Sequence, residues 1–163
     1  MRSAADDGFE ACLKAPFGAL GITTDGTHVT GIRFLSPAHA ARAPKKDTVA
    51  FLACVQLQAY LANPRYAFDL PLRLAGTHHQ LGVWEAMQRI PAGSLRTYGE
   101  IARELGSSAR AVGGACGANP IPVVVPCHRV VAANGALGGF MGARDDGFEL
   151  SIKRWLLGHE GAL

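Results

Sequence analysis

Cys127, His128 and Arg129 have the side chains best suited to covalent chemistry in this sequence. They follow the apolar run Val123–Val125 and then Pro126, whose ring fixes its φ angle and removes a backbone donor. A thiolate is a strong nucleophile, and a cysteine with an ordinary pKa of ~8.5 becomes reactive when a cation or a base favours the anion. The segment is therefore either a nucleophile site or a piece of core, because a cysteine beside β-branched residues is also a small buried apolar side chain.

The arrangement around Cys127 depends on the local backbone. The apolar run predicts an extended segment that delivers the cysteine, and neighbouring side chains of an extended segment point to opposite faces. Cooperation between Cys127 and His128 would then require a water molecule or a third group.

Composition limits the classes of protein that fit. A chain of 163 residues with 48% hydrophobic residues can form one ordinary domain or two small ones, and a net charge of +3 is too small to establish a polyanionic partner. The N-terminal residues lack the apolar core of a signal peptide, and no stretch approaches ~20 apolar residues, which predicts a cytoplasmic protein without a membrane partner. The cysteines have no metal-binding spacing, so we expect free thiols and no metal site; they are Cys12, Cys54, Cys116 and Cys127.

The first half predicts a small sheet with one helix. Residues 17–35 read as a hairpin with a type I′ turn at Asp25-Gly26. A helix is expected from Asp47 or Thr48 to about Ala62, followed by a strand over residues 68–74 and a domain boundary near Ala75.

The second half predicts helices. One begins after the cap Thr77 and ends before Pro91, and two shorter ones cover residues 98–105 and 109–118 across a tight turn, which suggests a helix-turn-helix. A closing helix is expected to begin at Lys153 and to end near Glu160.

The helix over residues 109–118 is unusually rich in glycine, which weakens a helix. Gly113, Gly114 and Gly117 then serve either close packing against another helix or close approach to a nucleic acid. Arg110 is the one long polar side chain in this helix. A smooth surface with one cation fits the minor groove better than base readout in the major groove.

Three motifs carry a resemblance to a known family. RAVGGACGANP, PCHRVV and WLLGHEG, within residues 77–163, resemble the O6-alkylguanine-DNA alkyltransferases, also called methylated-DNA–protein-cysteine methyltransferases. The resemblance implies a small α/β, ribonuclease-H-like domain over residues 1–75, made of a small sheet plus a helix. It also implies a mainly helical, winged-helix-like DNA-binding domain with a helix-turn-helix over residues 76–163.

The resemblance also implies roles for individual residues, inside and outside these motifs. Cys127 would accept the alkyl group, with His128 as its base through a water and Glu160 as the orienter of that histidine. Tyr98 would donate to the guanine ring, and Arg110 would fill the gap left by the flipped nucleotide. The further implied positions are DNA contacts at Ala109, Ala111, Gly113 and Gly114, a hinge at Asn119, and a base pocket at Val130, Gly138, Phe140 and Met141.

The implied function is a DNA repair protein. It would transfer an alkyl group from O6 of guanine, and from O4 of thymine, in duplex DNA to Cys127, once and irreversibly, as a monomer without a cofactor. The alternatives are a non-catalytic alkylated-DNA-binding module, in which the family cysteine is replaced, a winged-helix regulator and a Cys-His hydrolase. The sequence departs from the family after Gly138, at Phe140, Met141 and Ala143. An insertion between Gly142 and Lys153 contains Asp145, Asp146 and Glu149.

Overall fold

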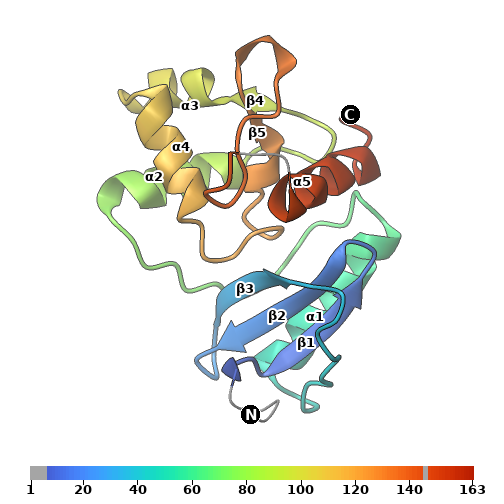
Figure 1. Ribbon diagram of the computed structural model, residues 1–163. Coiled ribbons are helices and arrows are strands. Elements are labelled where there is room, and N and C mark those ends of the chain that lie inside the picture. Colours follow the sequence, from blue (N-terminus) through green and yellow to red (C-terminus); the bar gives the residue numbers. More distant parts are fainter. Residues whose placement is uncertain (1–6, 145–146) are drawn as a thin grey trace. The chain divides into compact units, whose positions relative to one another are not determined.

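The computed structural model describes residues 7–144 and 147–163, so Asp145 and Asp146 lie outside the described residues. The chain forms two compact units, Met1–Leu74 and Ala75–Leu163. The first unit is a small antiparallel sheet with one helix and the second is mainly helical (Figure 1). An α/β unit followed by a helical unit is the order of classes that the sequence predicts.

Three strands form the sheet of the first unit, in the order β1-β2-β3. They are β1 (Ala11–Ala15), β2 (Gly18–Thr24) and β3 (Val29–Leu35), all antiparallel. The predicted hairpin corresponds to β2 and β3, whereas β1 was not expected. Ile22 lies opposite Ile32 in the register and both are buried, so one face of the sheet supplies the core.

Helix α1 (Val49–Ala62) packs on this sheet. The Thr48 side chain accepts a hydrogen bond from Phe51 N, which satisfies one of the free donors at the helix N-terminus. Leu57 and Tyr60 are almost completely buried, and they complete the core against the sheet.

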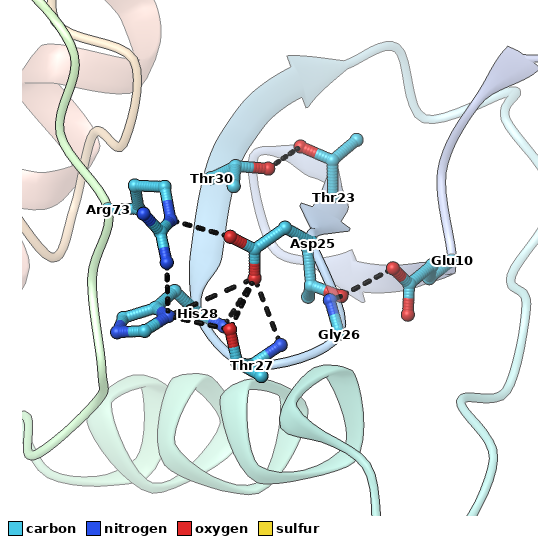
Figure 2. Close-up of polar contacts among 9 residues, drawn as sticks. Glu10, Thr23, Asp25, Gly26, Thr27, His28, Thr30 and Arg73 are labelled. Carbon is cyan, nitrogen blue, oxygen red and sulfur yellow. Dashed lines mark hydrogen bonds and ion pairs between the residues drawn. The ribbon is translucent and has the colours of Figure 1, made fainter.

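The turn between β2 and β3 is longer than the predicted type I′ turn. That turn needs positive φ at both central residues, but only Gly26 has it here (φ +95). The connection runs from Asp25 to His28 because the Asp25 carboxylate accepts hydrogen bonds from the backbone N–H groups of Thr27 and His28. The Asp25 carboxylate also accepts a hydrogen bond from Arg73 (Figure 2). The Nε–Oδ2 distance is 2.6 Å.

Residues 68–74 do not form the predicted strand. They run beside β3 with a single bridge between Val29 and Leu72, flanked by hydrogen bonds from Val29 N to Pro71 O and from Arg73 N to Val29 O. Gln56 binds both the carbonyl and the N–H of Asp69 at 2.8 Å, and Pro71 has no N–H. Too few backbone groups therefore remain for a longer ladder.

The second unit begins with three capped helices close to the predicted ranges. In α2 and α3 the side chain of the capping threonine accepts a hydrogen bond from the backbone N–H of the third helical residue, and the side chain of that residue accepts one from the threonine N–H. In α4 the capping residue is a serine. Gly106 ends α3 in the left-handed region (φ 64). These elements are α2 (His78–Gln88, cap Thr77), α3 (Tyr98–Leu105, cap Thr97) and α4 (Ala109–Gly117, cap Ser108).

Three elements near the site differ from expectation. Strands β4 (Arg96–Thr97) and β5 (Val130–Val131) form a short parallel pair that the sequence did not predict. Helix α5 (Phe148–His159) begins five residues before the expected Lys153, because Gly147 precedes a helical turn in which Glu149 suits the positive N-terminus. Within the described residues, no helix is both long and apolar enough to cross a membrane.

Candidate active site

The segment before Cys127 is a turn, which corrects the predicted extended strand. Val125 N donates to Ile121 O, and Val123 has φ 75, a left-handed conformation that is strained for a β-branched residue. The buried Asn119 side chain holds both ends of this turn: its Oδ1 accepts from Ile121 N at 3.0 Å and its Nδ2 donates to Val125 O at 2.8 Å. Such strain costs about 1–3 kcal/mol and persists only where the surroundings impose it, as the Asn119 amide does here.

Cys127 lies in a 3-10 turn, Cys127–Arg129, instead of an extended segment. The thiol is 3% exposed, and burial raises its pKa to about 11, against the opposing effects of the Asn119 amide and the Lys153 ammonium. At neutral pH the resting side chain is therefore a thiol, and a base must remove its proton before it can act as a nucleophile.

His128 and Arg129, the two residues after Cys127, form a hydrogen-bonded network with Glu160. His128 Nε2 lies 2.8 Å from Glu160 Oε2, and both side chains are completely buried. Arg129 donates to both oxygens of the same carboxylate at 2.9 Å and to Ile90 O at 2.6 Å. Three donors therefore hold Glu160 as a carboxylate, and the carboxylate in turn fixes the histidine ring.

The protonation of His128 follows from this network. Burial is the main cause that lowers its pKa, and the neighbouring cations Arg129 and Lys153 act in the same direction, against the Glu160 carboxylate. The ring is neutral at pH 7 and carries its proton on Nε2, since Nε2 faces a carboxylate. Nδ1 is then a buried acceptor with no partner among the described residues.

Lys153 is a completely buried ammonium on α5. Its Nζ donates to the carbonyls of Val130 (2.8 Å), Leu137 (2.6 Å) and Gly139 (2.9 Å). Three acceptors require three N–H donors, so the geometry is that of the charged form, although burial lowers its pKa to about 8. Lys153 thereby ties the loop after β5 to α5.

This loop presents Met141 to the thiol. Phe140 and Ala143 exchange backbone hydrogen bonds at 2.8 and 2.9 Å around Met141 (φ 52) and Gly142 (φ 85), and positive φ at both is what a type I′ turn requires. Met141 Sδ lies 3.8 Å from Cys127 Sγ. The turn therefore forms the wall of the site nearest to the nucleophile.

Tyr98 packs against the beginning of the same loop. A Cβ at Gly138 would lie 2.8 Å from the Tyr98 ring, so only glycine fits there, and the phenol donates to Gly139 O at 3.3 Å. Burial raises the pKa of Tyr98, which keeps the hydroxyl protonated and able to donate.

A cavity of about 1280 Å³ opens over the thiol. Most of the predicted site residues line it, including Cys127, Tyr98 and Arg110. Val130 does not; it is buried, and its carbonyl binds Lys153. The lining residues are Tyr98, Ala109, Arg110, Gly113, Gly114, Cys116, Gly117, Ala118, Cys127, Gly138, Gly139, Phe140, Met141, Gly142, Ala143 and Arg144.

The glycines of α4 divide between the two explanations that the sequence left open. A Cβ at Gly117 would lie 3.2 Å from Gly142 N, so that glycine serves close packing of the loop. A Cβ at Gly113 or Gly114 would meet no described residue within 4 Å, so packing against these parts of the chain does not explain the two glycines. They lie in the same cavity wall as Arg110.

Arg129 and Lys153 make contacts near the thiol that the sequence did not predict. Arg129 belongs to a motif that was recognised, but its carboxylate partner is 31 residues away and only the fold brings them together. Lys153 lies three residues after Leu150 and four residues before Leu157, and both leucines are buried. This position in an apolar helical stripe is the sequence pattern that could have predicted the burial of Lys153.

One cluster has metal-binding residue types. Ligand atoms of Asp7, Cys12 and His39 lie within 4.8 Å of one another. The Arg42 guanidinium already binds both Asp7 oxygens, at 2.7 and 3.0 Å, and burial raises the pKa of the Cys12 thiol. A protein cation thus occupies the position that a metal ion would need.

Comparisons with known proteins agree on one family. Residues 78–162 match the model of the 6-O-methylguanine DNA methyltransferase DNA-binding domain. Methylated-DNA–protein-cysteine methyltransferases are similar over most of their length: that of Methanosarcina acetivorans is 37% identical, covering 94% of this chain and 99% of its own, and that of Mycobacterium tuberculosis is 43% identical, covering 80% and 82%.

The solved structures support the same assignment. The crystal structure of Mycobacterium tuberculosis OGT in complex with DNA is 41% identical and superposes with a TM-score of 0.77, covering 93% of this chain and 91% of that one. The nucleophile, its buried histidine–carboxylate pair and the motifs around them therefore have one explanation: this chain belongs to the methylated-DNA–protein-cysteine methyltransferase family.

Proposed function

We propose that this protein repairs duplex DNA by moving an alkyl group from O6 of guanine, and from O4 of thymine, to Sγ of Cys127. The observation that carries the proposal is the combination of a buried thiol at the floor of the cavity with a neutral His128 whose Nδ1 is free to accept a proton. Family membership supplies the substrate class, and the geometry supports the residue roles proposed below.

The first step is deprotonation of Cys127. The Cys127 proton passes through one bridging water to His128 Nδ1, while Glu160 accepts from Nε2–H and stabilises the imidazolium that forms. Arg129 keeps that carboxylate ionised throughout. Lys153, whose charge lowers the thiol pKa, stabilises the thiolate.

The second step is displacement at a saturated carbon. The thiolate forms the S–C bond as the C–O6 bond breaks, and the electron pair of the broken bond stays on the guanine, which takes up a proton to become neutral. Tyr98, kept protonated by burial, is the donor that offsets charge on the leaving base. The product is a thioether, which water does not readily cleave, so each molecule acts once and no cofactor is needed.

DNA binding is assigned to α3 and α4 as a helix-turn-helix within a winged-helix-like unit. The bare surface of Gly113 and Gly114 allows α4 to approach the minor groove, with Ala109 and Ala111 as further small contacts. Arg110, exposed at the N-terminal end of α4, enters the duplex behind the flipped nucleotide. Asn119 is the hinge between this helix and the active-site turn.

The remaining expectations belong to the same proposal. The first unit, with its three-stranded sheet and α1, is assigned to a ribonuclease-H-like domain over residues 1–75. Its companion is the DNA-binding domain over residues 76–163. Four free cysteines suit a cytoplasmic location, and we expect a monomer.

The deciding experiment uses a duplex that carries one O6-methylguanine. Incubation with the protein, followed by peptide mass spectrometry, should place one methyl group per molecule on Cys127, and Cys127→Ser should abolish it. Repeated turnover would contradict the mechanism. So would methyl on Cys116, whose buried thiol has a pKa raised to about 12. Binding without transfer would favour the non-catalytic module instead.

The role of α4 has its own test, Gly114→Ala. Because no described residue lies within 4 Å of the added Cβ, the free energy of unfolding should rise by up to about 1 kcal/mol. Transfer from duplex should nevertheless slow roughly tenfold if the helix approaches DNA closely. Thermal unfolding and duplex transfer rates measure the two effects, and a stabilised variant with normal duplex transfer would remove Gly114 from the interface.

A further inference from the structure

Arg144 is the second arginine in the wall of the Cys127 cavity, and the sequence analysis gives it no role. Arg110 and Arg144 are the only charged side chains among the lining residues, all of which the structure describes. The cavity therefore has a positive rim around a floor of small, apolar and sulfur-containing side chains.

Within residues 7–144 and 147–163, Arg110 and Arg144 differ from other arginines in having no carboxylate partner. Arg42, Arg73 and Arg129 each bind an aspartate or glutamate. Arg110 and Arg144 are exposed, and neither forms an ion pair with another residue of the described ranges. A guanidinium that no internal carboxylate holds remains available to an anion from outside.

The position of Arg144 is fixed by the pocket wall. It follows directly after the Phe140–Ala143 turn, and its Cγ would lie 3.7 Å from a Cβ at Gly139, so its methylene stem passes over that glycine. The Gly139 carbonyl is bound by Tyr98 and Lys153. The side chain thus extends from a segment that the half-buried Tyr98 and the buried Lys153 hold in place.

The substrate brings an anion to this rim. When a base enters the cavity far enough for O6 to reach Cys127, the phosphates of its own nucleotide remain at the mouth. Arginine binds phosphate oxygens with paired donors, and phosphate contacts set the register of a protein on DNA. Arg110 is already assigned to the space inside the duplex, so the phosphate next to the flipped nucleotide needs another cation.

We propose that Arg144 binds a phosphate of the strand that carries the alkylated nucleotide, and so completes the positive rim of the cavity. This inference rests on the proposed function. It assigns Arg144 to substrate positioning, with no part in the transfer step, and it predicts that a simple positive charge at residue 144 is enough.

The test compares two substrates in wild type, Arg144→Ala and Arg144→Lys. Transfer from a duplex with one O6-methylguanine should fall roughly tenfold in Arg144→Ala at low salt, and Arg144→Lys should recover most of it. The slope of log rate against log salt concentration should decrease by about 1 in Arg144→Ala. Transfer from free O6-benzylguanine, which has no phosphate, should stay within about twofold of wild type in both variants.

The control is Arg33→Ala, which removes an exposed arginine from β3 and should leave the rate on both substrates unchanged. Equal losses on duplex and free base in Arg144→Ala would assign the residue to pocket shape and overturn the inference. An unchanged duplex rate or an unchanged salt slope would also overturn it. Failure of the wild type to transfer methyl to Cys127 would instead reject the proposed function, so the two failures are distinguishable.

Discussion

The two units each contain a polar cluster of one carboxylate, one arginine and one histidine, exposed in the first unit and buried in the second. In the first unit Asp25 binds Arg73 and lies beside His28, with side chains that are 33%, 58% and 37% exposed (Figure 2). In the second unit Glu160 binds Arg129 and His128, and the carboxylate and the histidine are completely buried. A carboxylate, an arginine and a histidine therefore have no fixed function of their own.

The difference lies in what burial does to each group. In the exposed cluster, backbone N–H groups already hold the Asp25 carboxylate and lower its pKa, and the cluster stabilises a turn. In the buried cluster the same types of contact fix a neutral histidine, one residue from a thiol, with one ring nitrogen free. Because His128 is buried and neutral and its Nδ1 has no partner among the described residues, this histidine can accept a proton.

The largest expected effect is that of Glu160→Gln. It removes the carboxylate and leaves the Arg129 charge buried without its partner, so the free energy of unfolding should fall by about 3 kcal/mol or more. His128 loses the acceptor that fixes its tautomer, so transfer should slow at least about 100-fold. Denaturant unfolding and transfer from free O6-benzylguanine measure these effects. A variant that is destabilised but transfers normally would show that the buried cluster is only structural.

The second prediction concerns pH. The folded protein keeps His128 neutral, with a pKa lowered from 6.5, whereas the unfolded chain takes up a proton there as the pH falls through 6.5. The unfolded state then binds more protons, so stability should decrease below about pH 6.5. Transfer should decline only at a lower pH, where His128 becomes charged in the folded state.

Denaturant unfolding and transfer rates at a series of pH values check this prediction. His128→Gln supplies the control, because it should lack the acidic decline in rate while being slower overall. A wild-type rate that declines around or above pH 6.5 would mean that the buried histidine is not the base.

The smallest effect is expected from Asp25→Asn, the matched change in the exposed cluster. Exposed ion pairs contribute little, and the backbone N–H groups can still donate to the amide oxygen. Transfer rates should stay within about twofold of wild type, and the midpoint of urea unfolding should move far less than in Glu160→Gln. A large loss of transfer would show that the comparison between the clusters fails.

The sequence predicted the parts of the fold that depend on local signals. Thr48, Thr77 and Thr97 marked the helix starts because capping uses residues within one turn. Cys127, Tyr98 and Arg110, to which the resemblance gives roles, line one cavity in the structure, and those roles remain predictions.

The failures come from specific contacts that residue composition does not reveal. The run before Cys127 has strand composition, yet the Asn119 amide holds it as a turn with a left-handed Val123. The parallel pairing of β4 with β5 and the carbonyl ligands of Lys153 join segments far apart in sequence. No local pattern contains such pairings.

The buried thiol has a consequence for the life of the molecule before it meets damage. A protein consumed by its own reaction cannot replace a nucleophile lost to an oxidant or a stray electrophile. Burial raises the pKa of Cys127 to about 11, and Met141 Sδ lies 3.8 Å from its Sγ. The resting side chain is therefore a protonated thiol of low reactivity. The protein therefore keeps its single reaction for a substrate that reaches the bottom of the cavity.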